Sequence, residues 1–273
     1  MAIEYAAKYS GKVDERFAVA ALTNQAVNND YDFVDVNVVK VYTVPTVALG
    51  NYTASGANRY GTPSELQNSV QTLTLTQDKA FTFTIDRKSE DDTAGAMEAG
   101  RALRRQVDEV IIPEVDKYRL SVMTTNAGKT ATGSITKTNA YDAFLDGTNA
   151  MRDAGVPVTG RLCFCSPAYY KAIKQDESFI KASDLAQNML ITGSVGMVDG
   201  TSMIPVPTSY LPSGVNFIMT HKVATVGPVK LESYKIHDNP PGINGKLVEG
   251  RIRFDAFVLN GKKNAVYVHK TNA

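Results

Sequence analysis

The sequence predicts an α+β fold, in which long strands and one long helix occupy separate stretches of the chain. Between residues 34 and 86, runs of alternating apolar and polar residues flank a segment rich in glycine, asparagine and serine. A long helical pattern follows, and further alternating runs close the chain. No repeating strand–helix–strand pattern is present, which argues against a parallel α/β sheet.

The first 33 residues are expected to form an arm rather than a domain. Their polarity is mixed, and a short helical pattern near Phe17–Val27 is broken by Asn28-Asn29-Asp30. The start of the chain lacks the apolar run of a signal peptide, and no stretch approaches the ~18 apolar residues of a membrane span. We therefore expect a chain that is made in a cytoplasm and does not enter a membrane.

The next stretch predicts a long projection built from strands. A two-residue period runs from Val34 to Val44 and resumes at Thr72–Thr76 and Phe81–Ile85. The intervening Gly50–Pro63 has the composition of turns and loops. The apolar side chains here are too few and too widely spaced to bury a core, so the projection needs the surface of a partner.

A long helix is predicted after this projection. Acidic residues at Glu90-Asp91-Asp92 and the following Thr93 favour a helix start. An apolar stripe then recurs at helical spacing, at Met97, Leu103, Val107, Val110, Ile111, Val115, Tyr118 and Val122. A helix that ends near Thr124 would contain about 32 residues and span roughly 48 Å. Pro113 lies inside it and should kink it or join two segments.

The remaining elements are shorter. Residues 126–139 read as a loop or small hairpin, and residues 176–200 are weakly patterned. The patterns predict helices at Tyr141–Ala154 and Pro167–Lys174, and short strands at Leu162–Cys165, Met203–Val206 and Val215–Thr220. Near the end of the chain, Lys246–Leu259 and Asn264–Val268 flank an Asn260-Gly261 pair, which predicts a β-hairpin.

Several stretches together resemble a known family. Thr72–Asp86 leads into the acidic helix start, and Pro113-Glu114-Val115-Asp116-Lys117-Tyr118-Arg119 lies within the helix. Gly196–Gly200, Ile204–Pro207 and Glu249–Leu259 follow in that order. This succession resembles the extended loop, spine helix, axial-domain strands and closing strands of tailed-phage major capsid proteins, whose fold is named after phage Hong Kong 97. The order is more specific than any single piece, and the resemblance covers residues 34–270.

The resemblance implies a domain organisation. Residues 1–33 would be an N-terminal arm and 34–86 the extended loop. Residues 87–139 and 246–273 would form a peripheral domain with the spine helix, into which an axial domain at 140–245 is inserted. Some members carry a long N-terminal scaffolding segment, but here the arm and the loop begin almost at Met1. A separate scaffolding protein is therefore expected.

The resemblance also implies a function. The chain would assemble with itself into hexamers and pentamers of an icosahedral shell, with a portal as a further partner, inside the bacterial host. In the virion the shell would enclose double-stranded DNA and touch it weakly, without sequence specificity. An alternative within the same fold is the shell protein of an encapsulin nanocompartment. Encapsulins typically begin with a helix that helps to bind cargo, whereas this N-terminus reads as a loose arm.

The residues expected to make inter-subunit contacts fall in two groups. Tyr52, Arg59 and Tyr60 lie at the tip of the loop, and Arg101, Arg104 and Arg105 lie on the spine helix. The arginines either form a solvated helix face with local ion pairs or hold the helix against a neighbour's loop. Some family members join a loop lysine covalently to a neighbouring asparagine, but Gly50–Pro63 contains no lysine. We expect a shell held by non-covalent contacts.

Composition and motifs argue against other classes of protein. Lys plus Arg is 29 and Asp plus Glu is 28, so the net charge of +1 does not indicate a dedicated DNA-binding domain. Cys163 and Cys165 are too few for a structural zinc site and read as small buried apolar residues. The three histidines, His221, His237 and His269, are isolated in the sequence. We therefore expect no enzyme activity, no catalytic residue, no metal and no cofactor.

Overall fold

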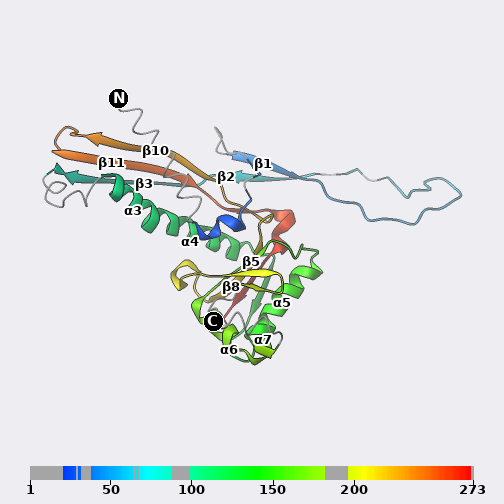
Figure 1. Cartoon of the computed structure of the whole chain (residues 1–273). Helices are drawn as coiled ribbons and strands as arrows, with labels where there is room; N and C mark the ends of the chain where they lie inside the picture. The colour runs from blue at the N-terminus through cyan, green and yellow to red at the C-terminus, as the bar shows by residue number, and fades with distance from the viewer. Residues whose placement is uncertain are drawn as a thin grey trace.

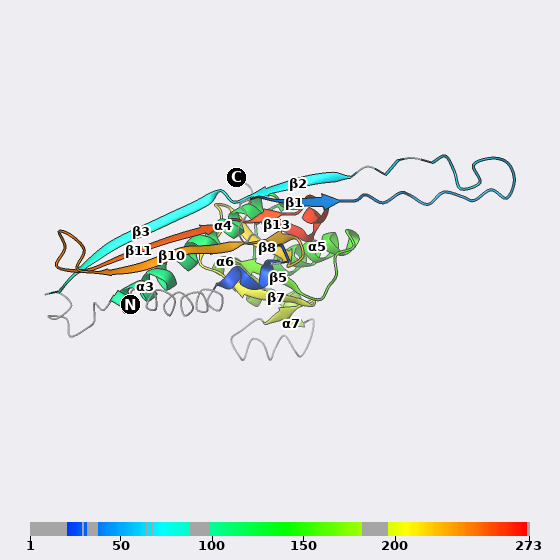
Figure 2. The same cartoon turned by 90° about the horizontal axis from the view of Figure 1, so that it is seen from above.

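The structure is a computed structural model, and it describes residues 21–28, 30–31, 38–63, 65–66, 68–87, 99–181 and 196–271. A long sheet lies over a helix, a second and wider sheet packs below them, and a thin loop projects far to one side (Figure 1). Seen from above, the long sheet and the projecting loop run along one line (Figure 2).

The projecting loop is built on one strand pair. Strand β1 (Val38–Thr43) pairs antiparallel with β2 (Ser69–Thr74), with Thr43 opposite Ser69. The chain between these strands extends away from the rest of the molecule (Figures 1 and 2). This confirms the predicted extended two-stranded loop, although the expected start of its first strand at Val34 lies outside the described residues.

The long sheet contains three antiparallel strands in the order β10-β11-β3. These are β3 (Gln77–Asp86), β10 (Val229–Asp238) and β11 (Gly245–Phe254). Although β3 follows β2 directly in the sequence, it pairs with β11 and not with a strand of the loop. The sheet packs its buried side chains, such as Val248 and Ile252, against the long helix below it.

The long helix is continuous from Ala99 to Thr125 and combines three segments. They are α3 (Ala99–Gln106), the π-helical η2 (Val107–Ile111) and α4 (Ile112–Thr125). The π-helical turn comes directly before Pro113, which has no N–H to donate and whose ring crowds the preceding turn. The predicted helix is thus confirmed, and its proline is absorbed by a wider turn. Its expected start at Glu90-Asp91-Asp92 lies outside the described residues.

The wider sheet has six strands in the order β4-β13-β8-β5-β7-β6. They are β4 (Lys129–Thr132), β5 (Arg161–Cys165), β6 (Met197–Val198), β7 (Thr201–Pro205), β8 (Val215–His221) and β13 (Val266–Lys270). Helix α4 packs on one face, and α5 (Ala140–Asp153) and α6 (Pro167–Gln175) pack on the other. A short helix, α7 (Glu177–Lys181), follows α6.

Most of these shorter elements agree closely with the prediction. Ser166 caps the first turn of α6, where its Oγ accepts a hydrogen bond from the Tyr169 N–H, directly before Pro167. Cys163 and Cys165 point to the α5–α6 face of the sheet and are free, buried thiols, as predicted. Residues 126–139 do contain a strand, β4, but it pairs in parallel with β13 instead of forming a hairpin.

The predicted C-terminal hairpin is wrong. Strand β11 ends at Phe254, and Asn260–Ala265 forms a 3-10 turn, η4, between the short β12 (Phe257–Val258) and β13. The chain leaves the long sheet after β11, and β13 lies in the wider sheet between β4 and β8. Both faces of β13 are buried there, as Tyr267 and Val268 show. A strand of a hairpin with one solvated face would leave half of these side chains in water.

Candidate inter-subunit contact surface

The extended loop carries an unusual amount of exposed apolar surface. Tyr60 is 91% exposed and Leu49 is fully exposed. Other large exposed apolar residues along the loop are Tyr42, Val44, Val47, Tyr52, Leu66 and Val70. Many large apolar side chains exposed along one slender projection are typical of a surface that becomes buried against another protein.

The tip of the loop brings the three predicted tip residues together. The rings of Tyr52 and Tyr60 meet edge to face, with centroids 5.1 Å apart. The Thr53 N–H donates to the Arg59 carbonyl at 3.1 Å, and the Arg59 Nε donates to the Gly56 carbonyl at 3.3 Å. Asn58 and Gly56 take positive φ angles of 58° and 88°, which closes the turn. The tip therefore presents an aromatic pair beside one cation.

The charge of the tip limits what it can bind. Arg59 is the only charged residue between Val44 and Pro63, and the first acidic residue beyond it is the exposed Glu65. A surface that accepts the tip should therefore offer apolar contact for the two tyrosines and a carboxylate for Arg59.

The base of the loop, by contrast, is firmly held. Leu73 and Leu75 are buried together with Val226 and Leu259. The Gln71 Nε2 donates to the Val258 carbonyl at 3.0 Å, and the Gln71 Oε1 accepts the Asn260 N–H at 2.9 Å. Buried apolar contacts and paired amide groups fix the direction in which the loop leaves the molecule.

A buried carboxylate marks the junction between loop and long sheet. Asp255 is 2% exposed and accepts hydrogen bonds from the Thr76 N–H at 2.7 Å and the Thr76 hydroxyl at 2.8 Å. It also accepts one from the Tyr118 hydroxyl at 2.9 Å, and burial together with this bond raises the pKa of Tyr118. Sequence reasoning missed Asp255, because its partners lie more than 130 residues away along the chain.

The three predicted arginines lie on the exposed side of α3. Arg101, Arg104 and Arg105 are all exposed, and the Arg105 Nε lies 2.7 Å from the Glu109 Oε1. Helix α3 lies at the opposite end of the molecule from the tip of the loop (Figure 1). The tip and the arginines are therefore not brought together within one chain, and any contact between them needs a second copy.

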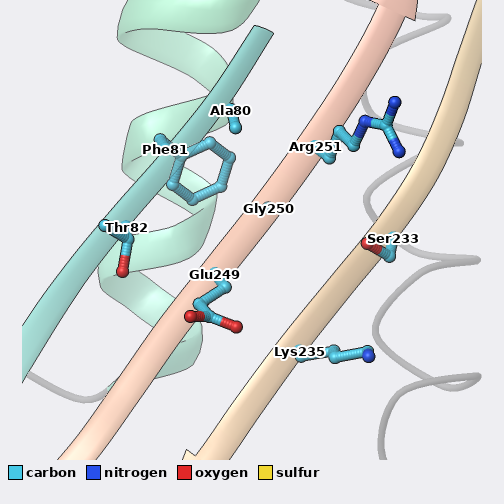
Figure 3. A pocket seen from close by; sticks show the side chains of 8 residues that line it. All are labelled: Ala80, Phe81, Thr82, Ser233, Lys235, Glu249, Gly250 and Arg251. Atoms are coloured by element: carbon cyan, nitrogen blue, oxygen red, sulfur yellow. The ribbon is translucent and has the colours of Figure 1, made fainter.

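The exposed face of the long sheet carries a shallow groove of about 360 Å³. Eight residues from three neighbouring strands line it (Figure 3): Ala80, Phe81, Thr82, Ser233, Lys235, Glu249, Gly250 and Arg251. Arg251 donates two hydrogen bonds to Asp78, at 2.9 and 2.5 Å, and thereby lowers the pKa of Asp78. The Glu249 carboxylate lies 3.3 Å from the His237 ring. The groove thus combines small residues with the charged side chains of Lys235, Glu249 and Arg251.

The described residues offer neither a metal site nor a helix that could span a membrane. No group of three or more His, Cys, Asp or Glu side chains in the described ranges is placed to hold a metal ion. The helices in the described part of the chain are all too short or too polar to cross a membrane.

Comparison with known proteins identifies the family. Residues 67–268 match the model of a family described as phage capsid protein, which is most of the chain. The chain belongs to this family and is a structural protein of a bacteriophage shell. No match was found among curated proteins.

Solved structures agree on the fold. A structure from Mycobacterium phage Che8 matches with a TM-score of 0.76 and 19% identity, over 91% of this chain and 90% of that one. The capsid of cyanophage P-SCSP1u matches with a TM-score of 0.70 and 12% identity, over 90% and 85%. A virus-like particle from Pyrococcus furiosus matches with a TM-score of 0.61 and 11% identity, over 98% and 100%. The fold is the Hong Kong 97-like capsid fold, as predicted. The family match favours the phage shell over the nanocompartment.

Proposed function

We propose that this capsid protein builds an icosahedral shell of hexamers and pentamers in which each extended loop lies against a neighbouring copy. The observation that carries the proposal is the loop itself, an exposed apolar projection on a firmly held base. An area of this kind is stable in water only when a partner covers it. Closed symmetry repeats each modest contact around a ring, so that weak contacts add up to a stable shell.

The six predicted residues have defined roles in this proposal. Tyr52, Tyr60 and Arg59 anchor the tip on the neighbour. Arg101, Arg104 and Arg105 face a neighbour's loop, where the exposed Glu65 offers a carboxylate. Since Gly50–Pro63 has no lysine, the shell is held by non-covalent contacts. The protein performs no catalysis and needs no cofactor.

The domain assignment is refined by the strand pairing. A peripheral domain would consist of the long helix and the three-stranded sheet, and this includes β3 and β10. An axial domain would consist of the six-stranded sheet with α5 to α7. Strands β4 and β13 pair within that sheet, which supports counting them with the axial domain although they lie outside residues 140–245.

The shell would be assembled in the cytoplasm of a bacterial host and would end in the virion. A separate scaffolding protein and a portal are the expected assembly partners. The near-zero net charge of the chain supports weak contact with packaged double-stranded DNA, without sequence specificity. No membrane takes part in this scheme.

A paired substitution at the tip tests the proposal. Tyr52→Ser with Tyr60→Ser should abolish shell formation where the wild-type chain forms shells, because each buried aromatic anchor contributes about 2 kcal/mol or more per contact. The melting temperature should not change, since both rings are exposed. Sedimentation and electron microscopy measure the shell yield.

The matched control is Tyr52→Phe with Tyr60→Phe, which keeps both rings and should still assemble. A wild-type yield of shells from the serine variant would refute the role of the tip.

A further inference from the structure

The helix stretch Pro113–Arg119 joins segments that are far apart in the sequence. Its polar side chains together reach several distant parts of the fold. Glu114 pairs with Lys79 on β3, Asp116 with the N-terminal turn, Tyr118 with Asp255, and Arg119 with both Thr23 and Gly227. These contacts fix the helix and also link the segments that contact it to one another.

The first link runs from the helix to the N-terminal turn η1 (Leu22–Ala26). The Asp116 carboxylate is 1% exposed and accepts the Leu22 N–H at 3.0 Å and the Thr23 N–H at 3.2 Å. It also accepts the Thr23 hydroxyl at 2.6 Å. The residue before the turn provides no side-chain cap, so Asp116 replaces a local cap with a distant one. Loss of this buried acceptor would leave two N–H groups unsatisfied.

The second link runs from the same turn to the short strand β9 (Thr225–Val226). Arg119 is 1% exposed, and its Nη1 donates to the Thr23 hydroxyl at 3.2 Å while its Nη2 donates to the Gly227 carbonyl at 2.7 Å. A Cβ at Gly227 would lie 2.9 Å from the Arg119 Nε, so only glycine fits there. Burial lowers the pKa of Arg119 to about 10, so its guanidinium stays charged at neutral pH.

The third link runs from β9 to the base of the extended loop. Strand β9 pairs with β12, and Val226 is buried with Leu73 and Leu75 of the loop base. The Val258 carbonyl of β12 accepts the hydrogen bond from Gln71 on β2. Contacts are therefore continuous from the N-terminal turn, through Asp116 and Arg119, to the residues that fix the direction of the loop.

We infer that Asp116 and Arg119 are positioning residues that couple the N-terminal turn to the base of the extended loop. While the turn is docked on α4, β9 and the loop base are held in one arrangement. A protein that pulls the turn Leu22–Ala26 away from the helix would loosen the loop base. The N-terminal arm would then regulate how the loop meets a neighbour, and this last step rests on the proposed function.

Amide hydrogen exchange on the full-length chain before assembly tests the coupling. Thr23→Val removes the hydroxyl that contacts both Asp116 and Arg119 while keeping the side-chain volume. Exchange in residues 22–28 should rise by about tenfold, the factor for losing a buried hydrogen-bond partner, and exchange in residues 70–76 should rise with it. Because coupling is reciprocal, Gln71→Ala should raise exchange in residues 22–28.

Glu109→Gln is the matched control, since Glu109 lies on the same helix and, among the residues that the structure describes, pairs with the exposed Arg105 alone. It should leave both segments unchanged. Faster exchange confined to residues 22–28 in the Thr23→Val chain, with residues 70–76 unaffected, would overturn the coupling. Asp116→Asn provides a second test of the same link. Exchange is read without any shell, so failure of the coupling and failure of the shell proposal are distinguishable.

Discussion

Burial decides the chemistry of the two cysteines. Cys163 and Cys165 alternate with Leu162 and Phe164 on β5, so both thiols point to the α5–α6 face. Desolvation raises the pKa of Cys165 to about 12 and places the pKa of Cys163 well above its usual value. Since the thiolate is the reactive form, neither side chain should act as a nucleophile in the folded chain.

A thiol-labelling experiment tests whether Cys163 and Cys165 are unreactive in the folded chain. A chromogenic disulfide reagent at pH 8 should leave both thiols unmodified in the folded chain and modify them as fast as the chain unfolds in denaturant. The variants Cys163→Ser and Cys165→Ser each report one thiol. Labelling of either thiol much faster than unfolding would show that the α5–α6 face opens in the native state.

The burial of some single residues could be predicted from the sequence, and the burial of others could not. The burial of the two cysteines could be predicted, because it follows from the pattern of the short strand that contains them. The burial of Asp116, Arg119 and Asp255 could not be predicted, because charged side chains are usually exposed to solvent. Their partners lie about 90 residues or more away along the chain, and only the fold brings them together. The resemblance pointed to the stretch that contains Asp116 and Arg119 but not to what each side chain contacts.

At the scale of elements, helices were more predictable than strand partners. The period of the long helix is a property of its own sequence, and so is the proline that produces the π-helical turn. Pairing is not local, and the Asn260-Gly261 signal was overridden because β13 buries both faces in the wider sheet. Strand β10 was not predicted, since the irregularity between Leu231 and Ser233 interrupts its two-residue alternation.

Charge reversal on the exposed face of α3 tests whether its arginines contact a neighbouring subunit. Arg101→Glu with Arg105→Glu should lower the yield of shells several-fold while leaving the monomer folded. Removing the Arg105–Glu109 pair costs the monomer only about 0.5 kcal/mol, as is usual for exposed helical pairs. Shell yield is measured by sedimentation, and circular dichroism of the monomer checks the helix content.

The corresponding control is Arg101→Lys with Arg105→Lys, which keeps both positive charges. An unchanged yield with the glutamate variant would favour the other reading, that these arginines form a solvated helix face.

For the whole molecule, the length of the loop relative to the body is the feature on which the proposed function rests. Two sheets and one long helix form a stiff body, and the loop projects from it far beyond any contact that one chain can supply. The need for a partner could be predicted from the sequence, because the loop has too few apolar residues for a core. In the proposed shell, the surface that receives the tip belongs to another copy, so it could not be predicted from the sequence of one chain.

Electron microscopy of the 273-residue chain, expressed alone and together with the proposed scaffolding protein, tests the central claim most directly. We expect closed isometric shells built from rings of six and five subunits, with each loop lying on a neighbour. Soluble monomers or open, irregular aggregates under both conditions would contradict it.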